Sequence, residues 1–295
     1  MDEQPDPDPA AMEHSSEVQV VSDLHLEYGP QYSTYTLPVT APFLLLCGNT
    51  GRLINYEGYL EFLESHVTRY RKVFLVLGLH DFHGVSYEDG LEIARVLTEE
   101  PTLDGKLVLL HQTRWDDPDS RLTILGCTLW SPIPEPPAIV VNNYDGNVLG
   151  GWPVEQYRRI HAEEVDWLRS SAAQLESPED SGRQVLVATH YGPFHEYTAP
   201  PQPNSDPSSP LPVIPLVDQE SWGRVDKWAF GHENYPTAVH RNGITLISNQ
   251  RCAIIRATPG PPRVRGDRYI FDPNLTVSWD PDSSSESLGS VSSAA

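Results

Sequence analysis

The sequence predicts a layered α/β domain, and three observations support this fold class. Short apolar runs alternate with segments of helical periodicity along most of the 295 residues. Several of these runs are continuous and β-branched, as is typical of strands buried on both faces of a sheet. Each run ends at a turn or a polar cluster. A chain of this length can bury a sizeable core, and we expect one domain over residues 17–279 rather than two small ones.

The predicted strands share a short apolar core bounded by polar or turn residues. In chain order they are Val18–Ser22, Pro42–Gly48, Lys72–Gly78, Lys106–His111, Leu122–Leu129, Gln184–Thr189, Val225–Gly231 and Ile244–Asn249, with a late pair within Tyr269–Trp279.

Helical periodicity is clearest in two places. Apolar residues repeat at three- and four-residue spacing over 59–70 and again over 157–168, where Pro153 opens the helix. Ser86–Thr98 is a third, weaker helix.

Three segments fall outside the pattern of strands and helices. We predict a flexible acidic segment at 1–16, a Pro-rich loop or lid at 194–221 and a disordered Ser-rich tail at 280–295.

The charge of the chain excludes some partners. Asp and Glu number 41 against 20 Lys and Arg, which gives a net charge of -21. This charge repels nucleic acid backbones and anionic membranes at long range. No segment approaches the roughly 20 apolar residues that a membrane span needs. We expect neither nucleic acid nor membrane as a partner.

Cysteine usage indicates the compartment. The chain has three cysteines, Cys47, Cys127 and Cys252. Each lies beside an apolar or strand-like run, and their spacing is not that of metal ligands. An odd number of buried thiols is typical of a reducing compartment. The first seventeen residues carry no basic region or apolar stretch of the kind found in secretory signals. We predict a cytoplasmic protein.

Chemically informative residues follow the predicted strands. Asp23, Asn49, His80, His190 and His232 each come just after a strand ends, where open α/β sheets collect ligands. They belong to the motifs Asp23-Leu24-His25, Gly48-Asn49, Gly78-Leu79-His80-Asp81, Thr189-His190-Tyr191 and Gly231-His232-Glu233-Asn234.

This pattern resembles that of the calcineurin-like metallophosphoesterases, from about Val18 to Ala253. In the family the corresponding runs read Asp-x-His, Gly-Asp, Gly-Asn-His-Glu/Asp, a lone His after a strand, and Gly-His-x-His. Leu125–Trp130 and Ile247–Arg251 extend the likeness. The resemblance implies a four-layer α/β/β/α sandwich of two mixed sheets.

Three ligand positions of the family are substituted in this chain. The bridging Asp is Asn49, the Asn ligand is Leu79 and the last His is Asn234. The resemblance implies a first metal at Asp23, His25, Asn49 and Asn234, and a second at Asn49, Leu79, His190 and His232.

The substitutions remove what a dimetal site needs. Two cations about 3.5–4 Å apart need an anionic bridge, whereas the amide oxygen of Asn49 is neutral and its other end is a donor. Leu79 offers no ligand atom. We therefore expect no metal, or at most one Zn, Mn or Fe ion held by Asp23, His25, His190 and His232.

The resemblance gives His80 the role of a proton donor beside the metals. An imidazole with a pKa near neutrality suits acid or base chemistry without a metal as well. We predict catalytic roles for His80, Asp23, His25, His190 and His232.

The residues at the rim of the predicted pocket differ in character from those of the family, since Asn49, Leu79 and Asn234 are all uncharged. We predict that a mostly apolar small molecule binds there; alternatively, the apolar residues of the lid only anchor it to the core. The predicted substrate-binding residues are Asn49, Leu79, Tyr191, Phe194 and Asn234. The oligomeric state stays open.

Three functions remain as alternatives. The first is an enzyme repurposed for non-hydrolytic acid/base chemistry of isomerase, cyclase or lyase type on a small organic substrate. The second is a weak mononuclear metal-dependent phosphoesterase, and the third is a non-catalytic binding module. The surviving imidazoles favour the enzymes, and the missing bridge weighs against the phosphoesterase.

The remaining histidines lack motif context. We expect His66, His111, His161 and His240 at the surface or at helix caps. His83 and His195 lie on loops near the predicted pocket.

Overall fold

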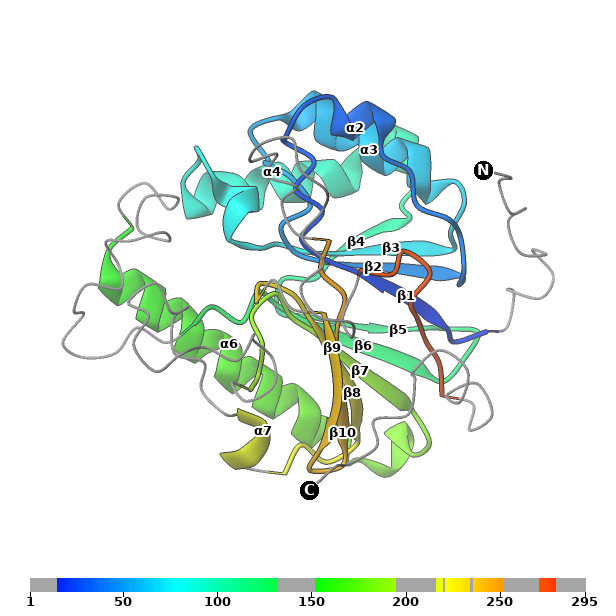
Figure 1. Cartoon of the computed structure of the whole chain (residues 1–295). Coiled ribbons are helices and arrows are strands. Elements are labelled where there is room, and N and C mark those ends of the chain that lie inside the picture. Colours follow the sequence, from blue (N-terminus) through cyan, green and yellow to red (C-terminus); the bar gives the residue numbers. More distant parts are fainter. Residues whose placement is uncertain are drawn as a thin grey trace, which may run out of the picture.

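Two β-sheets packed face to face form the centre of the molecule, with helices on both outer sides (Figure 1). The structure, a computed structural model, describes residues 15–131, 152–194, 216–219, 221–233, 236–251 and 271–279. This arrangement confirms the predicted α/β/β/α sandwich. Within the described residues no helix is long and apolar enough to cross a membrane.

The first sheet has five strands among the described residues, in the order β11-β1-β2-β3-β4. Strands β1 to β4 are parallel, and β11 is antiparallel to β1, so the sheet is mixed. The strands are β1 (Val18–Val21), β2 (Phe43–Cys47), β3 (Lys72–Val76), β4 (Leu107–Leu109) and β11 (Thr276–Val277).

The second sheet has six strands in the described part of the chain, in the order β5-β6-β7-β8-β10-β9. The four central strands are parallel and both edge strands are antiparallel to their neighbours. The strands are β5 (Thr113–Asp116), β6 (Leu122–Gly126), β7 (Gln184–Ala188), β8 (Val225–Phe230), β9 (Thr237–Arg241) and β10 (Ile244–Ser248).

Helices cover the outer faces. In Figure 1 the helices α2 (Gln31–Thr34), α3 (Tyr56–Val67) and α4 (Tyr87–Glu99) lie over the first sheet, whereas α6 (Val154–Gln174) and α7 (Leu216–Gln219) lie over the second. Short 3-10 turns are η1 (Leu79–Phe82), η2 (Pro101–Leu103) and η4 (Pro178–Asp180).

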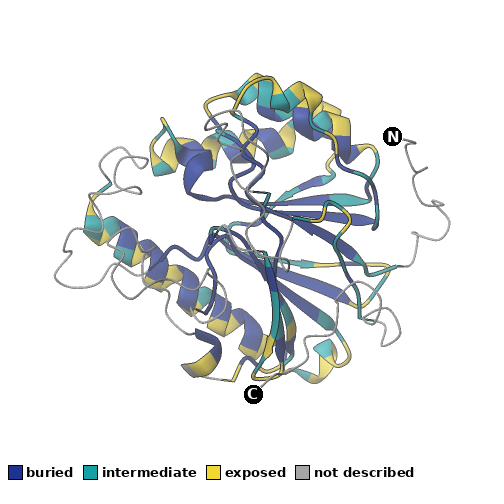
Figure 2. Ribbon diagram, in the orientation of Figure 1, coloured by how far each residue is buried: buried dark blue, intermediate teal, exposed yellow. Residues whose placement is uncertain are grey.

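Alternation along the strands explains the layers. Phe43 and Leu45 of β2 face the second sheet and join the cluster between the sheets, whereas Leu44 and Leu46 face the helices. In β7, Leu186 joins the cluster between the sheets, whereas Val187 faces the helices of the second sheet. The central strands are therefore buried on both faces, as Figure 2 shows, and this is why they read as continuous apolar runs.

The helices begin where local sequence favours it. Ser86 is the N-cap of α4, and its side-chain oxygen accepts the backbone N–H of Asp89 at 3.0 Å. Pro153 is the N-cap of α6, as its fixed φ suits a helix start. The three predicted helices are confirmed. The bounds of α4 differ from the prediction by one residue at each end, α3 lies three residues earlier than predicted, and α6 begins three residues earlier and continues to Gln174.

Several predicted strands differ from those observed. The predicted strand Lys106–His111 is only Leu107–Leu109, and the strands β5 and β9 were not predicted. Both are edge strands with partly exposed side chains, so they lack a continuous apolar run. Of the late pair, β11 alone falls within the described residues. Most of segments 1–16 and 194–221, and all of 280–295, lie outside those residues.

Candidate active site

The predicted site residues converge at one edge of the sandwich. Asp23 and His25 follow β1, Asn49 follows β2, and His80 lies in η1 after β3. His190 follows β7 and His232 follows β8 in the other sheet. Because parallel strands bring their carboxyl ends to one edge, residues far apart in sequence meet there. Asn234 lies outside the described residues.

Glycines in the motifs allow the loops to approach closely. A Cβ on Gly48 would lie 2.3 Å from His190 Nδ1, and Gly48 also has a φ of +85°. A Cβ on Gly78 would lie 2.5 Å from Asn49 Oδ1, and one on Gly231 would lie 2.7 Å from Asp23 Oδ2. The motif glycines therefore serve close contact between site loops.

The side chain of Asn49 joins two loops of the first sheet, and Asp23 extends the link to a loop of the second. Its Nδ2 donates to Asp23 Oδ1 at 2.8 Å, and its Oδ1 accepts the backbone N–H of His80 at 2.8 Å. The second oxygen of Asp23 accepts the backbone N–H of His232 at 3.0 Å. Asp23 and Asn49 are both buried and both have a positive φ. Both the oxygen and the nitrogen of the Asn49 amide are thus hydrogen-bonded within the protein.

Asp81 holds the loops after β2 and β3. Its buried carboxylate accepts the backbone N–H groups of Gly78 at 2.7 Å, Asn49 at 2.8 Å and Gly51 at 3.2 Å, and the hydroxyl of Tyr59 at 3.1 Å. Burial raises the pKa of Asp81 to about 7, against the effect of these hydrogen bonds. Asp81 is a structural residue whose role the sequence did not reveal.

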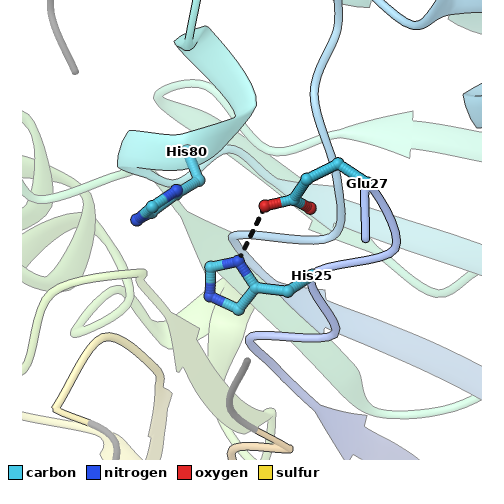
Figure 3. A group of neighbouring side chains, drawn as sticks. All are labelled: His25, Glu27 and His80. Atoms are coloured by element: carbon cyan, nitrogen blue, oxygen red, sulfur yellow. Dashed lines mark hydrogen bonds and ion pairs between the residues drawn. The ribbon is translucent and has the colours of Figure 1, made fainter. Parts of the chain in front are cut away.

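His25, Glu27 and His80 lie together (Figure 3). His25 and Glu27 come from the loop after β1, and His80 comes from η1. His25 Nδ1 is 3.1 Å from Glu27 Oε1, and the rings of His25 and His80 meet edge to face with their centroids 4.7 Å apart. Glu27 was missed by sequence reasoning. The sequence did offer a signal for Glu27. It lies two residues after His25, so it continues the spacing of the Asp-x-His motif.

These neighbours have pKa values moved in opposite directions. Burial acts to lower the pKa of His25, but the hydrogen bond to Glu27 and the charges of Asp23 and Glu27 outweigh it and raise that pKa. Burial acts to raise the pKa of Glu27, but His25 lowers it. Burial and the positive charge of His25 lower the pKa of His80 to about 4. At neutral pH His80 is therefore a neutral imidazole.

His190 is fully buried with a defined tautomer. Its Nδ1 donates to the backbone oxygen of Cys47 at 3.0 Å, which leaves Nε2 as an acceptor. Nε2 has no hydrogen-bond partner among the described residues. Burial lowers the pKa of His190.

His232 packs against Tyr191, with the centroids of the two rings 4.1 Å apart. Burial lowers the pKa of His232 to about 3.

Glu164 on α6 supports the loop that carries His190. Its fully buried carboxylate accepts the backbone N–H groups of Thr128 at 3.2 Å and Trp130 at 3.0 Å. The backbone oxygen of Thr128 accepts in turn from the N–H groups of His190 and Tyr191, both at 3.1 Å. Burial raises the pKa of Glu164 to about 8. A helix is thereby connected to a site residue through one loop.

Three predicted substrate-binding residues, Leu79, Tyr191 and Phe194, lie in apolar clusters. Leu79 packs in the cluster under the helices of the first sheet, which also contains Trp130 and Tyr191. Phe194 belongs to the cluster of the second sheet, and the Arg241 guanidinium lies 3.9 Å above its ring.

Two expectations about other histidines were wrong. His66 and His161 are buried rather than at the surface. His66 Nε2 accepts the backbone N–H of Leu37 at 3.1 Å, and His161 Nδ1 bonds the backbone oxygen of Trp130. Both imidazoles satisfy backbone groups in the core. His240 is exposed, as expected.

No family model matches this chain, and no curated protein matches it. Among solved structures it is similar to the phosphopantetheinyl hydrolase PptH from Mycobacterium tuberculosis, with a TM-score of 0.60 and 16% identity over 81% of this chain and 90% of that chain. The chain has a metallophosphoesterase-like fold. At 16% identity the likeness extends to the fold alone.

A second solved structure is a putative 5'-nucleotidase from Staphylococcus aureus in complex with alpha-ketoglutarate. The match has a TM-score of 0.40 and 12% identity, over 79% of this chain and 48% of that chain. A TM-score of 0.40 does not establish a common fold. The metallophosphoesterase-like fold therefore rests on the first comparison and on the sheet topology.

Proposed function

We propose that this chain is an enzyme that acts on a small organic molecule by imidazole acid/base chemistry, of isomerase, cyclase or lyase type, without a dimetal centre. The observation that carries this proposal is the position of the Asn49 amide. It lies between Asp23 and the backbone of His80, with a hydrogen bond of 2.8 Å on each side.

The residues present do not fit two metal ions. A dimetal pair needs a bridging anion, whereas Asn49 is neutral and directs an N–H at an oxygen of Asp23. Leu79, at the family's Asn ligand position, packs in an apolar cluster. We therefore derive no step through a metal pair.

The side chains that remain suit proton transfer. His80, with its pKa lowered to about 4, can accept a proton at neutral pH. His25, whose pKa is raised, lies against it edge to face and can donate one. Neighbouring groups with pKa values moved apart are the usual mark of an acid/base pair. His190 Nε2 is an acceptor that can orient a hydroxyl or amide of the substrate.

A second candidate is the weak mononuclear metal-dependent phosphoesterase. What favours it is the orientation of two imidazoles. His25 and His190 both have Nδ1 held, by Glu27 and by the backbone oxygen of Cys47. Metal-binding histidines are commonly fixed in this way, with the other nitrogen directed at the ion.

Turnover of the protein with and without metal distinguishes the two. Chelator-treated protein is incubated with a fraction of small organic metabolites, and products are followed by mass spectrometry beside a phosphate-release assay. We expect isomers, cyclised products or lyase fragments without phosphate release. His80→Ala should abolish this turnover, and the exposed control His240→Ala should not. Phosphate release that requires added Mn²⁺ would instead support the second candidate.

A further inference from the structure

The His25–Glu27–His80 group differs from the ligand set that the family resemblance implies. That set shares only His25 with it. One ring nitrogen of each histidine and one carboxylate oxygen of Glu27 all lie within 4.8 Å of one another. Figure 3 shows the three side chains converging from the loop after β1 and from the 3-10 turn η1. Ligand atoms around a tetrahedral Zn²⁺ ion are about 3.4 Å apart, so a shift of about 1 Å closes the group around one ion.

The Glu27 carboxylate has an uncommitted oxygen. Its side chain is only 2% exposed. Oε1 contacts His25, and Oε2 has no hydrogen-bond partner within the described part of the chain. A buried carboxylate oxygen without a donor is costly. A cation bound by this carboxylate would offset that cost.

We propose that His25, Glu27 and His80 bind one Zn²⁺ ion. Two imidazoles and one carboxylate are a donor set that zinc uses where a further position stays open. Glu27 supplies one negative charge, and Asp23 Oδ1 lies 3.9 Å from His25 Nε2 and adds a second charge nearby. Two negative charges balance the charge of a single ion, which is the reason that one ion fits here and a pair does not.

The ion would occupy the two imidazoles that the proposed acid/base chemistry uses. Bound Zn²⁺ should therefore inhibit that turnover. The metal site itself does not depend on the proposed function, because it is tested by binding. If Zn²⁺ binds and no metabolite is turned over, the acid/base proposal fails alone.

The test compares Zn²⁺ binding by the wild-type chain and three variants, measured by calorimetry and by metal analysis after dialysis. We expect one Zn²⁺ per wild-type chain. Glu27→Gln and His80→Ala should each weaken binding at least tenfold. His232→Ala should bind as the wild type does, because His232 belongs only to the alternative single-ion set of Asp23, His25, His190 and His232. Each variant is first shown to be folded by its melting temperature.

Two results would overturn the proposal. One is the absence of Zn²⁺ binding by the wild-type chain, and the other is binding that His232→Ala removes and Glu27→Gln leaves intact. If Glu27→Gln or His80→Ala fails to fold, X-ray absorption of Zn²⁺ bound to the wild type decides the question. The proposed site predicts two imidazole ligands, and the alternative set predicts three.

Discussion

The side-chain amide of Asn49 donates a hydrogen bond of 2.8 Å to the carboxylate of Asp23. Two residues at positions that the sequence resemblance assigns to metal ligands are thus bonded directly to one another. The backbone N–H of His80 completes the arrangement by donating to the other end of the amide. This link carries the expectation that the chain does not assemble a metal pair.

Restoring the substituted ligands should restore metal binding. The triple variant Asn49→Asp, Leu79→Asn and Asn234→His returns an anionic bridge and two further ligands. We expect its affinity for Mn²⁺ to rise by orders of magnitude and its stoichiometry to reach two. Each single variant should gain less. The measurement is calorimetric titration, and a folded triple variant with no gain would mean that the loops depart from the family geometry.

Phosphatase activity should stay near background. Without a bridged metal pair, neither the hydroxide nor the phosphate clamp forms. We expect no significant hydrolysis of generic phosphomonoesters or phosphodiesters with added Mn²⁺, Ni²⁺ or Zn²⁺, followed by release of a chromogenic leaving group. A turnover number within the ordinary enzyme range, roughly 1–10³ s⁻¹, would contradict the prediction.

Gly48 should be intolerant of a side chain. In Gly48→Ala the new Cβ meets His190 Nδ1 at 2.3 Å and the φ of +85° is strained as well. The expected loss is about 2–5 kcal/mol in the free energy of unfolding. Gly243→Ala is the matched control, since Gly243 also has a φ of +85° but has nothing within 4 Å of the added Cβ. It should lose only about 1 kcal/mol. Urea denaturation measures both, and equal losses would refute the steric explanation.

Glu164 should contribute a fall in the free energy of unfolding as the pH rises from about 5 to 8. Its pKa is about 8 in the folded chain against 4.5 unfolded, so the folded state keeps a proton that the unfolded state has lost. The contribution is fully present below pH 4.5 and is lost as the pH approaches 8. Asp81, with a pKa raised to about 7, acts in the same direction. The lowered pKa values of His80, His190 and His232 act in the opposite direction.

The variant Glu164→Gln should lose the contribution of Glu164 and keep those of the other groups. Its amide places a donor against a backbone N–H, so at pH 5 the variant should be about 1 kcal/mol less stable than the wild type. The difference should narrow by pH 8. Glu163→Gln, on the exposed side of the same helix and paired with Arg159, is the control and should follow the wild type. Melting temperatures across the pH range test this, and parallel curves for Glu164→Gln and the wild type would count against it.

Central strands were predictable from the sequence and edge strands were not. Strands such as β2 and β7 are buried on both faces, so their apolar runs are unbroken. Strands β5 and β9 leave several side chains partly exposed and pair on one side only. Their composition therefore does not separate them from loops.

The convergence of the motif residues was predictable because the strand ends define one edge of each sheet. Glu27, Asp81 and Glu164 were harder, since their roles depend on contacts between elements distant in sequence. Glu164 did carry a signal. It lies four residues after Ile160 and four before Leu168, on the apolar stripe of α6. A carboxylate at such a position is usually bound by buried donors, but the sequence does not identify them.

Asp81 and Glu164 also bear on how such a site can change. The loops that present the site residues are held by carboxylates that bind backbone N–H groups, at Gly78, Asn49 and Gly51 in one case and at Thr128 and Trp130 in the other. None of these bonds requires an ion. A side chain at the site can therefore be replaced without removing the bonds from Asp81 and Glu164 that hold its loop in place.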